Sequence, residues 1–177
     1  VTDPQFTPGL PKTQPGKAVY YIRPEGTVIR VVEPGAMGNP NGILLSPDGR
    51  TCYINNTRNL PAGNHIMAFD VNADGTLSNG REFATVFVPP AVLDRGERVS
   101  GADGMRMDVE GNLYVATHMG LQIFDKTGAF QGIVYTPVRP TSLAFGGDDM
   151  KTIYLACPTK LYKIRANIPG LRYPLGK

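Results

Sequence analysis

The sequence lacks the patterns that would indicate helices or a membrane span. Over its 177 residues, no stretch of about ten or more has a convincing apolar repeat near 3.6 residues. No apolar run approaches the length that a helix needs to cross a bilayer. The sequence therefore predicts an all-β protein with little or no helix, and no membrane partner.

Charge of one sign and clustered metal-binding side chains are also scarce. The formal net charge is only +3 and the basic residues are dispersed, which argues against a nucleic-acid partner. The two histidines and two cysteines do not have zinc-finger spacing, and no serine lies in a nucleophile-elbow motif. Cys52 and Cys157 fall on separate predicted strands, so we expect two buried free thiols, with a disulfide as the alternative.

The sequence does contain one segment three times. The three copies are PNGILLSPDGRTCYIN at 40–55, ADGMRMDVEGNLYVAT at 102–117 and PTSLAFGGDDMKTIYLAC at 140–157. Each copy reads as a short apolar strand, a tight turn with Gly or Asp, and a second strand built around a tyrosine. Repeats of about 40 residues made of short strands are typical of β-propeller blades.

The segments between these copies predict the outer strands of each blade. Residues 18–33, 65–86 and 121–135 are alternating runs around glycine-containing turns, which is the pattern of a β-hairpin. The spacing from the first copy to the second is longer than one blade by about 20 residues. We place this insertion within 56–66 and 86–100, which are rich in Asn, Pro, Gly and charge.

A propeller brings the first residue of each innermost strand to one central axis, and the equivalent residues here are Asn41, Asp103 and Thr141. An Asn-Gly pair can also be a simple turn signal. The tight turns, however, are assigned to Asp48-Gly49, Glu110-Gly111 and Asp148-Asp149. A carboxylate such as Asp103 directed into a narrow channel needs a counter-charge, which a hard cation with oxygen ligands would supply.

Loops on the same predicted face supply candidates for substrate binding. His118 follows the second strand of a repeat and could exchange protons at neutral pH in a substrate pocket, while a surface or packing role is the alternative. Thr141 could contact a ligand through its hydroxyl or simply fill the channel. The remaining candidates at the rim are Asn56, Arg58 and Phe6.

The repeated segments resemble the senescence marker protein / gluconolactonase / luciferin-regenerating enzyme family over nearly the whole chain. Members are six-bladed β-propellers with one divalent cation at the axis, and many hydrolyse lactones. The resemblance implies that Asn41 and Asp103 are metal ligands and that Asp103 is also the general base. It implies one divalent cation, calcium first with zinc or magnesium as alternatives, and a small lactone as substrate.

The same resemblance implies that the chain covers part of a ring. Thr2-Asp3-Pro4 resembles an "FTDP" element that ends the second strand of a blade near the middle of the family's sequence. The chain would then hold roughly three to three and a half blades. The parts would be 1–35 (outer part of one blade), 36–90 (second blade), 100–138 (third blade), 139–168 (most of a fourth) and 169–177 (tail). We therefore expect a fragment, or one chain of a propeller that a second polypeptide or an N-terminal segment completes.

The function predicted from these residues is that of a metal-dependent lactonase-like hydrolase. Propeller fold alone does not determine chemistry, so two alternatives stay open. One is a non-catalytic binding or scaffold module. The other is a strictosidine-synthase-like enzyme on the same scaffold, which needs no axial metal. The axial pair Asn41 and Asp103 favours the metal hydrolase.

Overall fold

The computed structural model describes residues 1–4, 15–57, 64–88 and 99–173, and all regular structure in them is β. No helix occurs in these ranges, so none that could span a membrane was found there. The absence of helical periodicity in the sequence predicted this result, because strands with period-two alternation bury one face and helices would need a different spacing.

The strands form four antiparallel sheets in which neighbours follow chain order. The first contains β1 (Thr2–Asp3), β2 (Ala18–Ile22) and β3 (Val28–Val32). The second contains β4 (Pro40–Leu45), β5 (Thr51–Asn56), β6 (His65–Val71) and β7 (Leu77–Thr85). The third contains β8 (Met105–Met107), β9 (Leu113–Thr117), β10 (Gly120–Phe124) and β11 (Phe130–Val134). The fourth contains β12 (Ser142–Gly146), β13 (Thr152–Ala156) and β14 (Leu161–Arg165).

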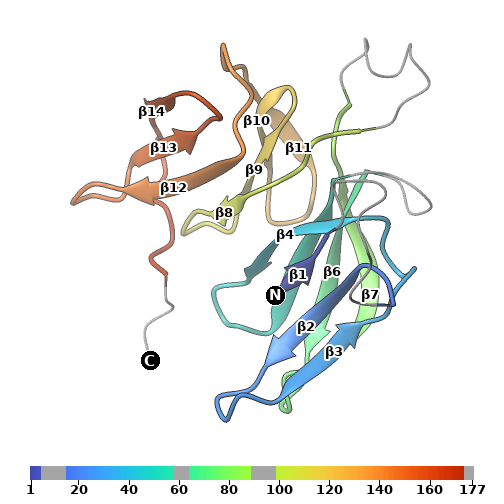
Figure 1. Cartoon of the computed structure of the whole chain (residues 1–177). Helices are drawn as coiled ribbons and strands as arrows, with labels where there is room; N and C mark the ends of the chain where they lie inside the picture. Colours follow the sequence, from blue (N-terminus) through green and yellow to red (C-terminus); the bar gives the residue numbers. More distant parts are fainter. Residues whose placement is uncertain (5–14, 58–63, 89–98, 174–177) are drawn as a thin grey trace.

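The first strands of consecutive sheets lie next to one another. β4 contacts both β1 and β8, and β8 contacts β12, so the sheets follow one another side by side (Figure 1). Up-and-down sheets that meet along their inner strands are the arrangement of propeller blades. The chain is therefore all-β and of the β-propeller type, as the repeats predicted.

The tight turn inside each repeat has one residue in a left-handed conformation, and in the third repeat this residue is not a glycine. Gly49 and Gly111 adopt positive φ angles of 70° and 88°, which glycine tolerates without a Cβ clash. In the third repeat this position is taken by Met150, with φ 56°. The sequence predicted the turn at Asp148-Asp149 but gave no sign that a methionine would occupy its left-handed position.

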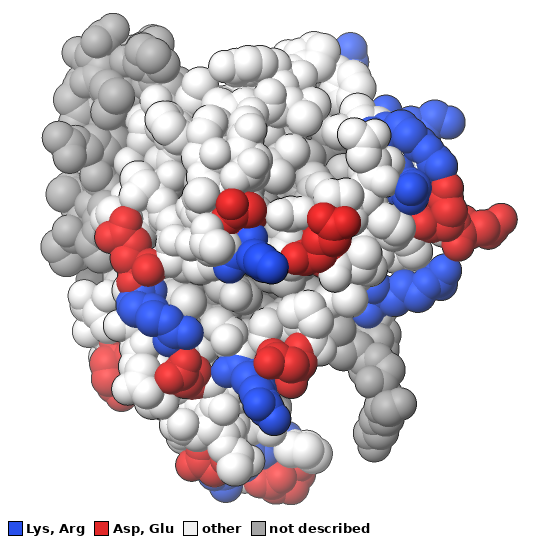
Figure 2. Space-filling model, turned by 180° about the vertical axis from the view of Figure 1, so that it is seen from behind, with Lys and Arg blue, Asp and Glu red and all other residues white. Residues whose placement is uncertain are grey.

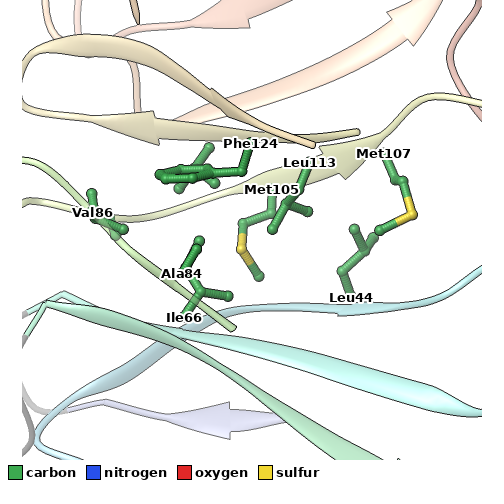
Figure 3. Packing of buried hydrophobic residues seen from close by; sticks show 10 residues of the cluster. Leu44, Ile66, Ala84, Val86, Met105, Met107, Leu113 and Phe124 are labelled. Atoms are coloured by element: carbon green, nitrogen blue, oxygen red, sulfur yellow. The ribbon is translucent and has the colours of Figure 1, made fainter. Parts of the chain in front are cut away.

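Apolar side chains between the second and third sheets fix the inner strands relative to one another. Leu44, Ile66, Ala84 and Val86 pack against Met105, Met107, Leu113 and Phe124. In Figure 3, Leu44 and Met107 point toward one another from β4 and β8. Burial of such side chains stabilises by about 1.5–3 kcal/mol each before entropy is counted. This cluster therefore sets the separation of the two strands whose starts carry Asn41 and Asp103.

Charged side chains of both signs are interspersed over the described part of the face in Figure 2. Exposed pairs such as Arg81 with Asp70 (2.7 Å) and Arg30 with Glu33 (3.3 Å) join neighbouring positions. Pairs of this kind contribute little to stability. Among the described residues on this face there is no continuous basic surface of the kind that nucleic-acid binding requires.

Both cysteines are free, as predicted, but only Cys52 is buried; Cys157 is partly exposed. Burial raises the pKa of the Cys52 thiol to about 11. Burial also raises the pKa of the Cys157 thiol, but this side chain is partly exposed, so we expect one thiol per native chain, that of Cys157, to react well before the other with a disulfide reagent at about pH 8. Both thiols should react after unfolding in guanidinium, and Cys157→Ser should remove the fast phase. Two fast thiols in the native protein would contradict this account.

Candidate functional site

The starts of three inner strands meet, as the repeat predicted. Asn41 is the second residue of β4, while Asp103 and Thr141 lie just before β8 and β12. The Asn41 Nδ2 atom donates a hydrogen bond to the carbonyl of Ala102 (3.2 Å), and the Gly104 amide donates to the carbonyl of Thr141 (3.0 Å). Contacts of this kind connect all three positions in one place.

Two glycines allow these strands to approach so closely. A Cβ on Gly42 would lie 2.1 Å from the backbone oxygen of Asp103, and one on Gly104 would lie 2.8 Å from the Cα of Ser142. Neither glycine has a positive φ, and Gly42 lies within β4. The Asn41-Gly42 pair is therefore a point of close backbone approach and not a turn, which confirms the interpretation from the repeat.

Asn41 is held through its amide nitrogen. Nδ2 donates to the hydroxyl of Thr57 (2.9 Å) as well as to the carbonyl of Ala102, and the Thr57 hydroxyl also donates to that carbonyl (2.5 Å). No donor from the described residues is paired with Asn41 Oδ1. The amide nitrogen is thus directed at Thr57, Ala102 and the Asp103 carboxyl, and no hydrogen bond from the described residues occupies its oxygen.

Asp103 is half-buried, and its surroundings favour the neutral form. Burial raises the pKa of the Asp103 carboxyl above its ordinary value, while the charge of Arg139 and a hydrogen bond from the side-chain amide of Asn41 act in the opposite direction. A carboxylate whose pKa lies above its ordinary value is a better proton acceptor near neutral pH than an exposed aspartate. A cation beside it would restore the ionised form.

Asn55, which was not among the residues predicted for the site, connects its two strands. Asn55 is fully buried at the end of β5. Its Oδ1 accepts a hydrogen bond from the Gly42 amide (3.0 Å), and its Nδ2 donates to the carbonyl of Asp103 (2.6 Å). One side chain therefore ties the Asn41-Gly42 segment to Asp103. The only signal was a polar residue at the end of an otherwise apolar strand.

His118 lies in the turn between β9 and β10, against the segment that precedes Asp103. Its backbone amide donates to the carbonyl of Ser100 (2.8 Å), and its ring covers Gly101, where a Cβ would lie 1.8 Å from His118 Cδ2. Arg139 Nη1 donates to His118 Nε2 (3.0 Å), which requires a neutral ring with its proton on Nδ1. Burial and the charge of Arg139 lower the pKa of His118, which agrees with the neutral form.

Arg139 is the second residue that the sequence did not single out. It is exposed and lies two positions before Thr141. Its backbone is held on both sides, because the carbonyl of Val138 accepts hydrogen bonds from Thr136 and Cys157, and Pro140 is buried. A residue before proline is also restricted to extended conformations. The guanidinium acts electrostatically on Asp103 and contacts His118, so it belongs to the same site.

Replacing Arg139 with glutamine should raise two pKa values at once. Its positive charge lowers the pKa of both Asp103 and His118, so its removal makes a proton on either group less costly. We expect both NMR titration midpoints to move to higher pH in Arg139→Gln. The matched change Arg50→Gln, in the exposed turn after β4, should leave both midpoints in place. Unchanged midpoints in Arg139→Gln would contradict this geometry.

For the other predicted substrate-binding residues, the structure shows contacts within the protein or no described position. Asn56 is only 1% exposed and its Oδ1 accepts a hydrogen bond from the Asn39 amide (2.6 Å), which favours a structural role. The Thr141 hydroxyl donates to the carbonyl of Ala156 (3.2 Å), so a contact with substrate stays a prediction. Arg58 and Phe6 lie outside the described residues.

The donors at the site fit part of a cation shell. The described residues contain no group of three or more His, Cys, Asp or Glu side chains that could hold a metal ion. Asn41 Oδ1 and the Asp103 carboxylate are instead two oxygen donors that a cation could use. Oxygen donors suit calcium or magnesium, whereas zinc favours nitrogen and sulfur. Water and substrate oxygens would supply further ligands.

Comparison with known proteins gives the family. Residues 3–158 match the family described as SMP-30/Gluconolactonase/LRE-like region. A gluconolactonase of Zymomonas mobilis is 27% identical over 154 residues, which are 86% of this chain and 41% of that protein. A regucalcin of Danio rerio is 32% identical over 143 residues, which are 78% of this chain and 43% of that protein.

A solved gluconolactonase structure from Xanthomonas campestris has a TM-score of 0.73 at 26% identity, with 96% of this chain and 52% of that one covered. The chain thus spans about two fifths of the curated relatives above and about half of this solved structure. The match over most of the sequence and the shared β architecture lead to one conclusion: the chain belongs to the SMP-30/gluconolactonase/LRE-like family.

Proposed function

We propose that the chain carries the metal-binding and catalytic residues of a lactone hydrolase. One observation carries the proposal: Asn41, in β4, lies beside Asp103, just before β8, and among the described residues no donor occupies the Asn41 amide oxygen, while the Asp103 carboxyl is half-buried. Similarity to proteins named gluconolactonase supports the choice of a lactone as substrate. Calcium is the preferred cation, because both donors are oxygens.

The residues divide the chemistry between them. A bound divalent cation would polarise the lactone carbonyl and stabilise the charge that develops on its oxygen. Asp103 accepts a proton from water as the water oxygen attacks the carbonyl carbon. When the ring C–O bond breaks, protonated Asp103 returns its proton to the leaving alkoxide, and the carboxylic acid that forms loses its own proton to solvent. Asn41 holds the cation and transfers no proton, because an amide does not titrate in this range.

We further propose that the complete ring has six blades and that polypeptide beyond the four sheets supplies the others. The chain covers 52% of the similar gluconolactonase structure and contributes four sheets of three or four strands, which supports this proposal. The blades of this chain would lie within 1–35, 36–90, 100–138 and 139–168. An N-terminal segment or a second polypeptide could complete the ring, and intact mass of the purified protein would distinguish them.

Asn41→Ala should weaken the binding of calcium first and turnover second. The purified protein, with any polypeptide that co-purifies, is stripped with chelator and titrated with calcium, magnesium or zinc while lactone hydrolysis is followed. Asn41→Ala removes a ligand but not the base, so excess cation should restore part of the rate. The same change at the exposed turn residue Asn72 should have no effect on the titration.

The two outcomes of this titration separate the candidate functions. Hydrolysis that depends on a divalent cation and requires more of it in Asn41→Ala supports the lactonase. A protein that binds no cation and hydrolyses no lactone would contradict the proposal and would favour the scaffold module instead.

A further inference from the structure

Arg139 carries a positive charge that no described carboxylate pairs with at short range. Within the described ranges, it makes no ion pair at 4.0 Å or less, whereas Arg81 pairs with Asp70 and Arg165 with Asp149. Its hydrogen bond to the protein goes to the neutral ring of His118 (3.0 Å). Donors of an exposed guanidinium that meet no carboxylate remain available for a ligand.

The protein nevertheless holds the backbone on both sides of this arginine. The carbonyl of Val138 accepts hydrogen bonds from Thr136 and Cys157, and the buried Pro140 restricts the residue before it. His118 in turn is fixed by its bond to Ser100. Holding a long side chain costs conformational entropy, and a contact with a neutral histidine returns little of it. A side chain with a held backbone and one anchored nitrogen loses less freedom when its other donors bind a ligand.

The charge balance of the site specifies the kind of ligand. Without a cation, Asp103 and Arg139 have one negative and one positive charge within electrostatic reach of each other. A divalent cation on Asp103 leaves the site with a net positive charge. An uncharged sugar lactone would not compensate it, whereas a lactone with its own negative group would.

We propose that Arg139 selects lactones that bear an anionic group, carboxylate or phosphate, outside the ring. The proposal rests on the proposed lactonase function and deepens it. The guanidinium binds the anionic group while the lactone carbonyl lies at Asn41 and Asp103. His118 is a positioning residue that accepts a hydrogen bond from the arginine and orients its remaining donors outward.

Two matched pairs of substrates test this selectivity. The first compares γ-butyrolactone bearing a carboxylate next to the ring oxygen with γ-valerolactone, which bears a methyl group there. The second compares a phosphate monoester of glucono-δ-lactone with glucono-δ-lactone itself. The wild-type protein should have a higher kcat/KM for the anionic member of at least one pair, chiefly through KM, and the pair that responds identifies the group. The preference should shrink as salt concentration rises.

Arg139→Gln should reduce the anionic-to-neutral ratio of kcat/KM by about tenfold or more, since charged hydrogen bonds are the strong ones. Arg139→Lys keeps the positive charge but loses the paired N–H donors of the guanidinium. It should retain part of the anionic-to-neutral ratio of kcat/KM. Arg50→Gln makes the same charge change in an exposed turn and should leave the ratio unchanged. If Arg139→Gln slows both members of a pair equally, the arginine acts only through its charge on Asp103. The proposal would then be wrong.

Calorimetry with hydroxyglutarate, the opened form of the carboxylated lactone, adds a readout that needs no turnover. Wild-type protein should bind it more tightly than 4-hydroxypentanoate, the opened form of γ-valerolactone, and Arg139→Gln should lose the difference. Absence of hydrolysis of every lactone would contradict the proposed function. Hydrolysis without any preference for the charged member, together with equal binding of the two products, would overturn only the selectivity.

Discussion

Replacing Asp103 with alanine should lower lactone hydrolysis by about a hundredfold or more. The substitution removes the charge that binds the cation and the proposed base together. Excess cation would therefore not restore the rate, because the base is still missing. Asp103→Asn keeps the shape and an oxygen donor, and should therefore bind the cation more weakly than wild type but still lack the base. Turnover and calcium affinity are measured on both variants.

A matched control separates this loss from a general effect of removing a carboxylate. Asp148 is exposed in the turn between β12 and β13, and Asp148→Ala should turn over like the wild type. Circular dichroism should show that Asp103→Ala keeps its strands. Turnover close to that of the wild type in a folded Asp103→Ala would show that the base lies elsewhere.

The rate should also depend on pH in a direction that the surroundings of Asp103 determine. Burial raises the pKa of its carboxyl. Without cation, Asp103 therefore becomes protonated at a higher pH than an exposed aspartate when the pH is lowered. Cation binding favours the ionised form and lowers that pKa. The acid limb of the pH–rate profile should therefore move to lower pH as calcium concentration is raised. A limb that does not move would indicate that the titrating group is not a metal ligand.

Gly42→Ala should have the largest effect on stability among single changes at the site. The new Cβ would lie 2.1 Å from the backbone oxygen of Asp103 and 2.6 Å from Asn55 Nδ2, so β4 and the segment before β8 must separate. Overpacking of this kind costs about 1–3 kcal/mol, and more where backbone is the obstacle. We expect a loss of about 3 kcal/mol in the free energy of unfolding by urea, with weakened calcium binding.

Gly146→Ala is the control for this change. Gly146 also lies in a strand without a positive φ, and its Cβ would meet only ring atoms of Tyr154, the nearest at 3.0 Å. That ring can move, so stability should change by less than about 1 kcal/mol. If Gly42→Ala were as stable as Gly146→Ala, the close approach of β4 to Asp103 would be wrong.

The sequence could predict the sheets and the axial positions because each repeat encodes the same strand and turn. Asn41, Asp103 and Thr141 were found by their equivalent places in three copies, and the structure brings them together. Period-two alternation and glycine turns are local signals, so they need no knowledge of the neighbouring sheets. The family resemblance added the roles of Asn41 and Asp103.

Residues whose roles depend on contacts between sheets could not be found this way. Arg139 joins the site because a loop from the third sheet brings it beside His118, and no repeat position marks it. Asn55 bridges Gly42 and Asp103, which are distant in sequence. The burial of Asn56 likewise depends on the packing around Asn39 and could not be inferred from the sequence, which predicted a loop where β5 in fact continues.

The central claim is that Asn41 and Asp103 hold one divalent cation, and an anomalous-scattering experiment tests it most directly. Crystals of the purified protein, with any polypeptide that completes the ring, are soaked with calcium or with manganese as its substitute. The account predicts one anomalous peak with Asn41 Oδ1 and the Asp103 carboxylate both at about 2.3–2.6 Å for calcium. A peak bound elsewhere, with Asn41 and Asp103 free of metal in a protein that hydrolyses lactones, would contradict it.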